Sequence, residues 1–296
     1  MPDNEFSKIL FVINPSSGTG KTDWKQEIIN FFKNKHESYE IFELTGKDDK
    51  SEIKKKLAEY NPCKVIAVGG DGTVKMVAEE LLHTEMILGI LPAGSANGMA
   101  TELGIKDEVQ EALDIIVNGK TQKIDVLKLN DKNQSIHLSD IGLNAMLVHY
   151  FEKGNQRGML GYAKVMFKVF RKKRLMRLDI QVNGENISRA AYMAVIANAR
   201  TYGTGAVINP EGNISDGKFE LIIMRKINLV HLFRMLVSHK PFNQDYIETI
   251  HAEKAVITSA KKNHFQVDGE YSGKTDKVII EIIPSSLKVL VPLLNK

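Results

Sequence analysis

The amino-acid sequence predicts an α/β domain with a parallel sheet, followed by a β-sandwich-like domain. Up to residue 123, short apolar runs suited to buried strands alternate with segments of helical periodicity, the pattern of parallel strands with helical crossovers. From residue 124 on, apolar strands follow one another with few helices between them, and Asn183-Gly184 is a hairpin signal. We therefore expect domains over residues 1–123 and 124–285.

The first domain is expected to contain four strands and four helices. Asp23 has the side chain of an N-cap and precedes the first helix. Apolar runs predict strands over 8–13, 39–44, 65–68 and 86–91, and helical periodicity predicts helices over 24–35, 48–60, 75–82 and 109–118.

The second domain is expected to consist mainly of strands. A helical insertion over 158–177 interrupts them. The strands are predicted over 123–129, 135–143, 178–182, 190–197, 219–224, 247–258, 264–267 and 277–283.

Composition and charge bound the class of protein. The chain has 296 residues, enough for a sizeable core, and a formal net charge of +4. That charge is too small to argue for a nucleic-acid partner, but it is compatible with an anionic membrane surface. The single cysteine, Cys63, excludes an internal disulfide framework, and beside a predicted buried strand it is expected to pack in the core.

The lack of a recognisable targeting signal predicts a cytoplasmic protein. No apolar run approaches the ~20 residues that span a bilayer, and the first residues, MPDNEFSK, are polar and acidic, unlike a signal peptide. The basic run Arg171-Lys172-Lys173-Arg174 ends the helical insertion. It fits either a solvated helix end favoured by the macrodipole or a contact with anionic lipid headgroups in transient peripheral membrane association.

Residues 65–74, Val-Ile-Ala-Val-Gly-Gly-Asp-Gly-Thr-Val, join a predicted buried strand to a predicted helix. The glycines of this stretch are Gly69, Gly70 and Gly72. They can adopt positive φ and let a phosphate approach the backbone N–H groups closely. The Asp71 carboxylate would repel a bare phosphate. Its position is explained if a cation lies between the two groups, or if Asp71 accepts a proton from a hydroxyl group. The alternative is an ordinary strand-to-helix turn with Thr73 as the N-cap.

Two more polar loops follow strands of the first domain, so that loops at 14–22, 69–73 and 92–98 all follow predicted parallel strands. Parallel strands present their carboxyl ends at one edge of the sheet, where ligands of such sheets bind. The coincidence of the three loops predicts a nucleotide site at that edge.

These loops, in this order, resemble the motifs of the diacylglycerol kinase catalytic-domain family, which includes soluble bacterial lipid kinases and sphingosine kinases. The matching motifs are Asn-Pro-Ser-Ser-Gly at 14–18, Gly-Gly-Asp-Gly-Thr at 69–73, Pro-Ala-Gly-Ser-Ala-Asn at 92–97, Ser-Asp-Gly-Lys-Phe at 215–219 and Val-Asp-Gly-Glu at 267–270. The resemblance implies a first domain like those of NAD kinase and phosphofructokinase, rejoined by residues 286–296, with an ATP site in the cleft between the domains.

The resemblance also implies a set of nucleotide-binding residues. They are Asn14, Pro15, Ser17, Gly18, Thr45, Gly69, Gly70, Asp71, Gly72, Thr73, Gly94, Ser95 and Asn97. These residue types suit phosphoryl transfer, which depends on positioning and charge neutralisation.

For catalysis, the resemblance places the general base in Asp268-Gly269-Glu270, with Glu270 favoured over Asp268. A magnesium-binding loop would use Asn213, Asp216 and the carbonyl of Lys218. Asp71, the third catalytic candidate, and Asp125 match acids linked to this network in the family. The implied activity is transfer of the γ-phosphate of ATP, with Mg²⁺, to a hydroxyl of a diacylglycerol-like or long-chain-base lipid.

The motifs leave other possibilities open. Gly98 and Ser95 depart from the usual bacterial diacylglycerol kinase loop, so the acceptor lipid is not defined. Residues His149, Tyr150, Phe151, Met159, Leu160, Met166, Phe167 and Phe170 could line an acyl-chain channel or pack in the core. The rival functions are a kinase of a soluble substrate such as NAD and a nucleotide-binding regulator without turnover. A homodimer is also left open.

Overall fold

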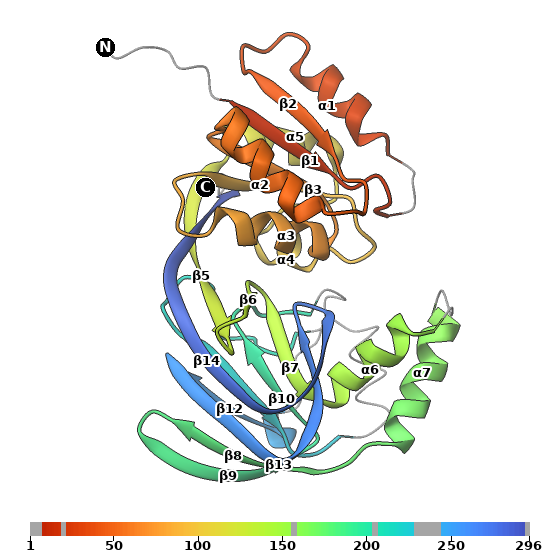
Figure 1. Ribbon diagram of the computed structural model, residues 1–296, viewed down its shortest axis with the longest axis vertical. Helices are drawn as coiled ribbons and strands as arrows, with labels where there is room; N and C mark the ends of the chain where they lie inside the picture. Colours follow the sequence, from red (N-terminus) through yellow and green to blue (C-terminus); the bar gives the residue numbers. More distant parts are fainter. Residues whose placement is uncertain (1–7, 19–21, 155–158, 203–206, 228–243, 294–296) are drawn as a thin grey trace. The chain divides into compact units, whose positions relative to one another are not determined.

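The computed structural model of the protein (Figure 1) describes residues 8–18, 22–154, 159–202, 207–227 and 244–293, with the backbone alone at 159–163. It divides into two compact units. The first unit comprises Met1–Ile124 and Ser285–Lys296, and the second comprises Asp125–Pro284.

The first unit contains a parallel sheet. Its strands are β1 (Ile9–Ile13), β2 (Tyr39–Glu43), β3 (Lys64–Gly69) and β4 (Ile87–Pro92). They lie in the order β4-β3-β1-β2, and β3 pairs in parallel with both β1 and β4. The last part of β14 (Glu270–Val291) joins this sheet in parallel beside β4, with Lys288 opposite Ile87. All five residues of β1 are buried, as an apolar run in a sheet with two covered faces requires.

Helices connect these strands, as the alternating pattern predicts (Figure 1). They are α1 (Trp24–Phe32), α2 (Asp49–Tyr60), α3 (Asp71–Leu81), α4 (Gly98–Glu102) and α5 (Val109–Asn118). The side chain of Asp23 accepts a hydrogen bond from the N–H of Gln26 at 3.1 Å and so caps α1 as expected.

The second unit is built on antiparallel strands and completes the predicted fold class. Two strands, β14 and β5 (Lys120–Leu129), contain residues of both units. The other strands are β6 (Asn133–Ser135), β7 (Leu138–Gly142), β8 (Met176–Val182), β9 (Glu185–Ala191), β10 (Met193–Ala197), β11 (Phe219–Met224), β12 (Ile247–Ala252) and β13 (Lys254–Val267). The main path runs β12-β11-β10-β7-β13-β14, and β8 pairs with β13 and β9.

Two apolar clusters cover opposite faces of the central strands. In β11, Phe219 and Leu221 belong to one cluster, whereas Ile222 belongs to the other. The second cluster includes Leu143 of α6 (Leu143–Glu152) and Val165 of α7 (Met159–Arg171). Because alternate residues point to opposite faces, a strand buried on both sides is mostly apolar. β11, in which Glu220 is the single charged residue, could therefore be predicted from its sequence.

Several predicted elements end or begin elsewhere in the structure. The strand expected over 135–143 is divided into β6 and β7, and α6 begins at Leu143. Asp140 accepts from the N–H of Ala145 at 2.8 Å, a side-chain bond that satisfies an amide of the first turn of α6. The strands expected over 190–197 and 247–258 are also divided, at Tyr192 and Glu253.

Two further expectations were wrong. Helix α3 begins at Asp71, four residues before the predicted start, so Thr73 lies inside its first turn and Gly70 is the N-cap. Cys63 is exposed and does not pack in the core, because it precedes β3 instead of lying within it.

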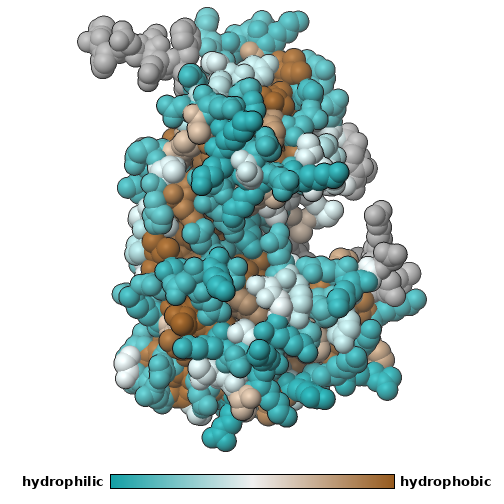
Figure 2. Space-filling view, in the orientation of Figure 1, coloured by the Kyte–Doolittle hydropathy of each residue, from teal (hydrophilic) through white to brown (hydrophobic). Residues whose placement is uncertain are grey.

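The face of the molecule in Figure 2 carries mostly hydrophilic side chains, with hydrophobic ones in small groups among them. In the described part of the chain, no helix is both long and apolar enough to cross a membrane.

Two neighbouring isoleucines of α1 provide a test of this core. Ile28 is fully buried, whereas Ile29 is 37% exposed. We expect Ile28→Ala to lower the free energy of unfolding of the first unit by about 2–5 kcal/mol and Ile29→Ala by less than about 1 kcal/mol. Urea unfolding followed by the fluorescence of Trp24, the single tryptophan, measures both. Equal losses would contradict the placement of α1.

Candidate active site

The three polar loops of the first unit meet at the carboxyl ends of β1, β3 and β4. The N–H of Asn14 donates to Val68 O at 2.9 Å, and the N–H of Ala93 donates to Gly69 O at 3.0 Å. The side-chain amide of Asn14 also donates to the hydroxyl of Thr73 at 3.2 Å. These bonds fasten neighbouring loops to one another, so that several predicted nucleotide-binding residues lie together. Residues 19–21 of the first loop lie outside the described residues.

Asp71 connects two of these loops. Its carboxylate accepts from the N–H of Gly98 at 3.0 Å and from the N–H of Met99 at 3.1 Å, the first amides of α4. An acid at a helix N-terminus satisfies unpaired N–H groups and complements the positive end of the helix dipole. The aspartate within the glycine-rich stretch therefore has a structural function that requires no cation.

The glycines of this stretch serve close packing. The expectation of positive φ at Gly69, Gly70 and Gly72 was wrong, since none of them adopts it. A Cβ on Gly69 would lie 2.4 Å from the Thr73 hydroxyl, and a Cβ on Gly94 would lie 2.5 Å from the Cα of Gly70. The backbones of two loops thus approach so closely that a side chain has no space.

The remaining predicted nucleotide-binding residues surround this contact. Gly18 has a φ of +71°, and a Cβ there would lie 2.2 Å from Ala93 O, so glycine is required for two reasons. Asn97 accepts from the N–H of Gly94 at 2.9 Å and fixes the loop that exposes Ser95. Thr45 lies after β2, where its N–H donates to Asp49 at 2.9 Å. Pro15 is exposed and Ser17 half-buried in the turn after β1.

In the second unit, Asp268 and Gly269 form the two-residue turn between β13 and β14. Both have positive φ, 50° and 86°, which is the geometry of a type I′ hairpin turn. The carboxylate of Asp268 is buried and accepts from the Ser135 hydroxyl at 2.6 Å and from two backbone N–H groups, at residues 136 and 137. Glu270, directly after the turn, is exposed. The two predicted catalytic acids therefore occupy different environments.

Two buried polar side chains, joined by a hydrogen bond, support the same turn from inside the unit. Gln266 accepts from the N–H of Gly269 at 2.6 Å and donates through its amide nitrogen to Asp140, also at 2.6 Å. Burial raises the pKa of Asp140 to about 6, although donors from Asn144, Gln266 and Ala145 favour its ionised form. Neither residue could be predicted from the sequence, because a single polar residue within an apolar strand gives no motif.

An aromatic cluster surrounds Tyr271, the residue that follows Glu270. The hydroxyl of Tyr271 lies 2.9 Å from His264 Nδ1, and the ring centroid of Tyr271 is 4.2 Å from that of His149. Its N–H donates to Glu152 of α6 at 3.1 Å. Burial, followed by the charge of Lys274, lowers the pKa of His264 to about 4, so that its imidazole is neutral near pH 7.

The predicted metal loop is ordered by hydrogen bonds within the second unit. Asp125 accepts from the N–H of Gly217 at 2.6 Å, and Asp216 accepts from the N–H of Lys218 at 3.0 Å. Asn213 accepts from the N–H of Ser215 at 3.1 Å. The described residues contain no group of three or more histidine, cysteine, aspartate or glutamate side chains placed to hold a metal.

Asn198, next to this loop, has an unsatisfied oxygen. Its side-chain nitrogen donates to the carbonyls of Asp125 at 2.9 Å and Ile136 at 3.1 Å, which fixes the orientation of the amide. Its Oδ1 is buried and has no hydrogen-bond partner among the described residues. A hard cation or its bound water would satisfy such an oxygen, and carboxylate, amide and carbonyl oxygens are the ligands Mg²⁺ prefers. By residue type alone, these oxygen donors fit Mg²⁺.

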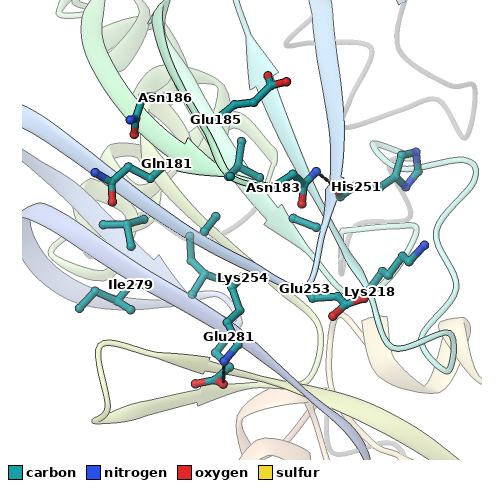
Figure 3. Close-up of a pocket in the computed structure, with 16 residues that line it drawn as sticks. Gln181, Asn183, Glu185, Asn186, Lys218, His251, Glu253, Lys254, Ile279 and Glu281 are labelled. Carbon is teal, nitrogen blue, oxygen red and sulfur yellow. Dashed lines mark hydrogen bonds and ion pairs between the residues drawn. The ribbon is translucent and has the colours of Figure 1, made fainter.

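A hollow of about 900 Å³ lies elsewhere on the second unit (Figure 3). Lys254 and Glu281, 2.7 Å apart, are paired at one side of it. At another side, His251 contacts the buried Glu220 at 3.0 Å. Of the predicted site residues, Lys218 alone contributes to the lining, so this hollow is not the predicted nucleotide site.

Family models match both parts of the chain. The model described as "Diacylglycerol kinase catalytic domain" matches residues 8–129, and the model described as "YegS C-terminal NAD kinase beta sandwich-like domain" matches residues 140–291. Together the two models extend over most of the chain, and the gap between them, residues 130–139, lies near the division between the two units.

Individual proteins agree with the family models. The chain is 29% identical over 294 residues to a Klebsiella pneumoniae (strain 342) protein named "Probable lipid kinase YegS-like", with 97% of each chain covered. It is 27% identical over 219 residues to a diacylglycerol kinase of Bacillus subtilis (strain 168), with 71% of each covered. A crystal structure of a diacylglycerol kinase from Bacillus anthracis str. Sterne has the same fold, with a TM-score of 0.75, 19% identity and 98% of each chain covered.

The contact between Asp71 and α4 can be tested by amide hydrogen exchange. Asp71→Asn replaces a charged acceptor of two N–H groups by a neutral amide, and bonds to charged groups contribute about 1.5–3 kcal/mol. We expect exchange at Gly98 and Met99 to become roughly 10- to 100-fold faster. Asp114→Asn, on the exposed side of α5, is the control and should leave both amides unchanged. Unaltered exchange in Asp71→Asn would show that the acid does not hold the loop.

Asp140 makes the stability of the second unit depend on pH. Its pKa is higher in the folded protein, about 6, than its usual 3.8, so between these values the folded state binds more protons than the unfolded state. Stability attributable to this group therefore falls as pH rises from about 4 to 6, by about 3 kcal/mol in all. We expect Asp140→Asn to remove this slope in urea unfolding at a series of pH values. If the free energy of unfolding depended on pH in the same way in both proteins, Asp140 would not be the group responsible.

Proposed function

Because this chain belongs to the family that joins a diacylglycerol kinase catalytic domain to a YegS-type C-terminal domain, we propose that it is an ATP- and Mg²⁺-dependent lipid kinase. The observation that carries this proposal is the joining of the loops at 14–18, 69–73 and 92–97 at one edge of the parallel sheet of the first unit. Names of relatives such as the lipid kinase of Klebsiella and the diacylglycerol kinase of Bacillus subtilis support a lipid acceptor.

The first unit would bind the nucleotide. At Gly70 and Gly72, which carry no Cβ atom, phosphate oxygens would approach backbone N–H groups closely. Ser95 is exposed in the loop after β4 and could add a hydroxyl donor. We propose that the residues predicted from the family motifs form this site, with Asp71 holding its loops together.

Glu270 is the proposed general base. It is exposed and is positioned by the hairpin turn before it and the aromatic contacts of Tyr271 after it, so its carboxylate can accept the proton of a lipid hydroxyl. Asp268 already accepts three hydrogen bonds from residues 135–137 and would have to give up some of them to accept a substrate proton. We therefore assign Asp268 the role of holding the turn.

Residues of the loop at 213–218, including Asn213, Asp216 and the carbonyl of Lys218, would hold Mg²⁺, with Asn198 contributing directly or through a water. When bound, the ion supplies positive charge that neutralises phosphate oxygens. Asp125 keeps the loop in place through the N–H of Gly217.

The acceptor is proposed to be a primary hydroxyl of a diacylglycerol-like or long-chain-base lipid. Of the apolar residues considered for an acyl-chain channel, Met166 is buried in the core, whereas Phe167 and Phe151 are 52% and 38% exposed. The side chains of residues 159 and 160 lie outside the described residues. A cytoplasmic location with transient attachment to a membrane surface follows from the proposal, and a homodimer remains a prediction.

One observation favours a second function. The C-terminal family model is itself described as NAD kinase beta sandwich-like, and a Gly-Gly-Asp-Gly-Thr loop also occurs in NAD kinases. A kinase of a soluble substrate such as NAD is therefore the alternative that the experiment must distinguish.

The function can be tested by transfer of labelled γ-phosphate from ATP and Mg²⁺ to mixed micelles of diacylglycerol, monoacylglycerol, sphingosine or ceramide, with NAD as the soluble substrate. We expect label in one lipid class. Glu270→Gln should lower kcat about 100- to 10,000-fold, the usual contribution of a general base, without lowering the free energy of unfolding.

Asp268→Asn is the matched control for Glu270→Gln. It should lower the free energy of unfolding by about 1.5–3 kcal/mol, because a charged acceptor of three buried hydrogen bonds is lost. Label only in NADP would favour the alternative function, and ATP binding without any transfer would favour a regulatory protein. A stable Asp268→Asn protein with the kcat loss expected for Glu270→Gln would reverse the two assignments.

A further inference from the structure

A second hollow of about 520 Å³ lies on the second unit, apart from every predicted site residue. Its polar lining comes from β9, β12 and the residues that follow β11. The lining residues that matter are Leu175, Ser188, Arg189, Arg225, Lys226 and Glu248. This hollow differs from the one in Figure 3 in the charge of its lining.

Two of the cationic side chains of this hollow share one carboxylate. Arg189 Nε lies 2.9 and 2.8 Å from the two oxygens of Glu248, and its Nη1 donates to Ser188 O at 3.1 Å. Arg225 Nη1 is 3.7 Å from the same carboxylate. Hydrogen bonding from Arg189 lowers the pKa of Glu248, so the acid is ionised at neutral pH.

Lys226 has an exposed side chain and no ion pair among the described residues. The lining therefore contains one carboxylate, two guanidinium groups and one ammonium group, which leaves a net charge of +2 in the hollow. Guanidinium groups favour phosphate because their N–H groups form paired bonds to its oxygens. The hollow is thus complementary to a phosphate group.

An apolar side chain and a basic run adjoin this cationic lining. Leu175 is 56% exposed at the hollow, directly after Arg171-Lys172-Lys173-Arg174. Lys173 Nζ donates to Ile227 O at 3.4 Å, so the basic run contacts the segment that carries Arg225 and Lys226. Basic groups beside an exposed leucine match a ligand whose phosphate adjoins an acyl region, as in an anionic phospholipid at a membrane surface.

We propose that this hollow binds the headgroup of an anionic phospholipid that is distinct from the acceptor substrate. The basic run would contact the surrounding lipid surface. The inference rests on the proposed function only in that a lipid kinase must reach a membrane, and its test requires neither ATP nor an acceptor lipid.

The test is sedimentation of the full chain with vesicles of phosphatidylcholine, with and without phosphatidylglycerol, in the absence of nucleotide. A lysine or arginine near an anionic surface contributes roughly a fivefold change in partition, so Arg225→Ala/Lys226→Ala should lower binding to the phosphatidylglycerol vesicles roughly 30-fold. Both side chains are exposed, and the Arg189–Glu248 pair remains intact. Transfer to an acceptor in neutral detergent micelles should be unchanged.

Lys261→Ala/Lys262→Ala is the matched control, because it removes the same charge from exposed positions on β13. A loss of vesicle binding equal to that of Arg225→Ala/Lys226→Ala would show a general charge effect and overturn the site. Release from vesicles by millimolar glycerol phosphate, or binding of a polyglutamate peptide as tight as that of vesicles, would instead identify a free-phosphate site or an acidic-peptide site and also overturn it. Failure of phosphoryl transfer with normal vesicle binding would overturn the proposed function alone.

Discussion

The close approach of the Gly70 and Gly94 backbones determines the geometry of the candidate nucleotide site. A Cβ on Gly94 would lie 2.5 Å from the Cα of Gly70, so the loops after β3 and β4 can meet only without side chains there. Asp71 then completes the junction by accepting from the first two amides of α4.

Carboxylates perform a similar structural task in the second unit. Asp268, Asp140 and Asp125 are all buried, and each accepts hydrogen bonds from groups distant in sequence. A buried carboxylate is costly unless several donors surround it, and those donors fix the segments that carry them. Glu270 directly follows the turn that Asp268 stabilises, but its own side chain is exposed. An exposed carboxylate suits a group that must exchange a proton with a substrate.

The two hollows of the second unit differ in whether the charges of their lining residues are balanced. The hollow of Figure 3 contains the mutually paired Lys254 and Glu281, so part of its charge is already neutralised. In the hollow beside Leu175, two guanidinium groups compete for one carboxylate. The excess positive charge there has no structural purpose that the described contacts reveal, and this imbalance is the basis of the proposed headgroup site.

The sequence by itself determined the fold class, the α5 and β11 segments and the cap of α1, because apolar periodicity and capping act over a few residues. It also placed the polar loops at the carboxyl edge of the parallel sheet. Only the tertiary structure decided that Asp268 is buried while Glu270 is exposed, since the partners of Asp268 are 131 to 133 residues away along the chain. In the sequence, Gly70 likewise resembles a phosphate-loop glycine, but its closest neighbour, Gly94, belongs to another loop. Such contacts leave no local pattern because they depend on segments brought together by folding.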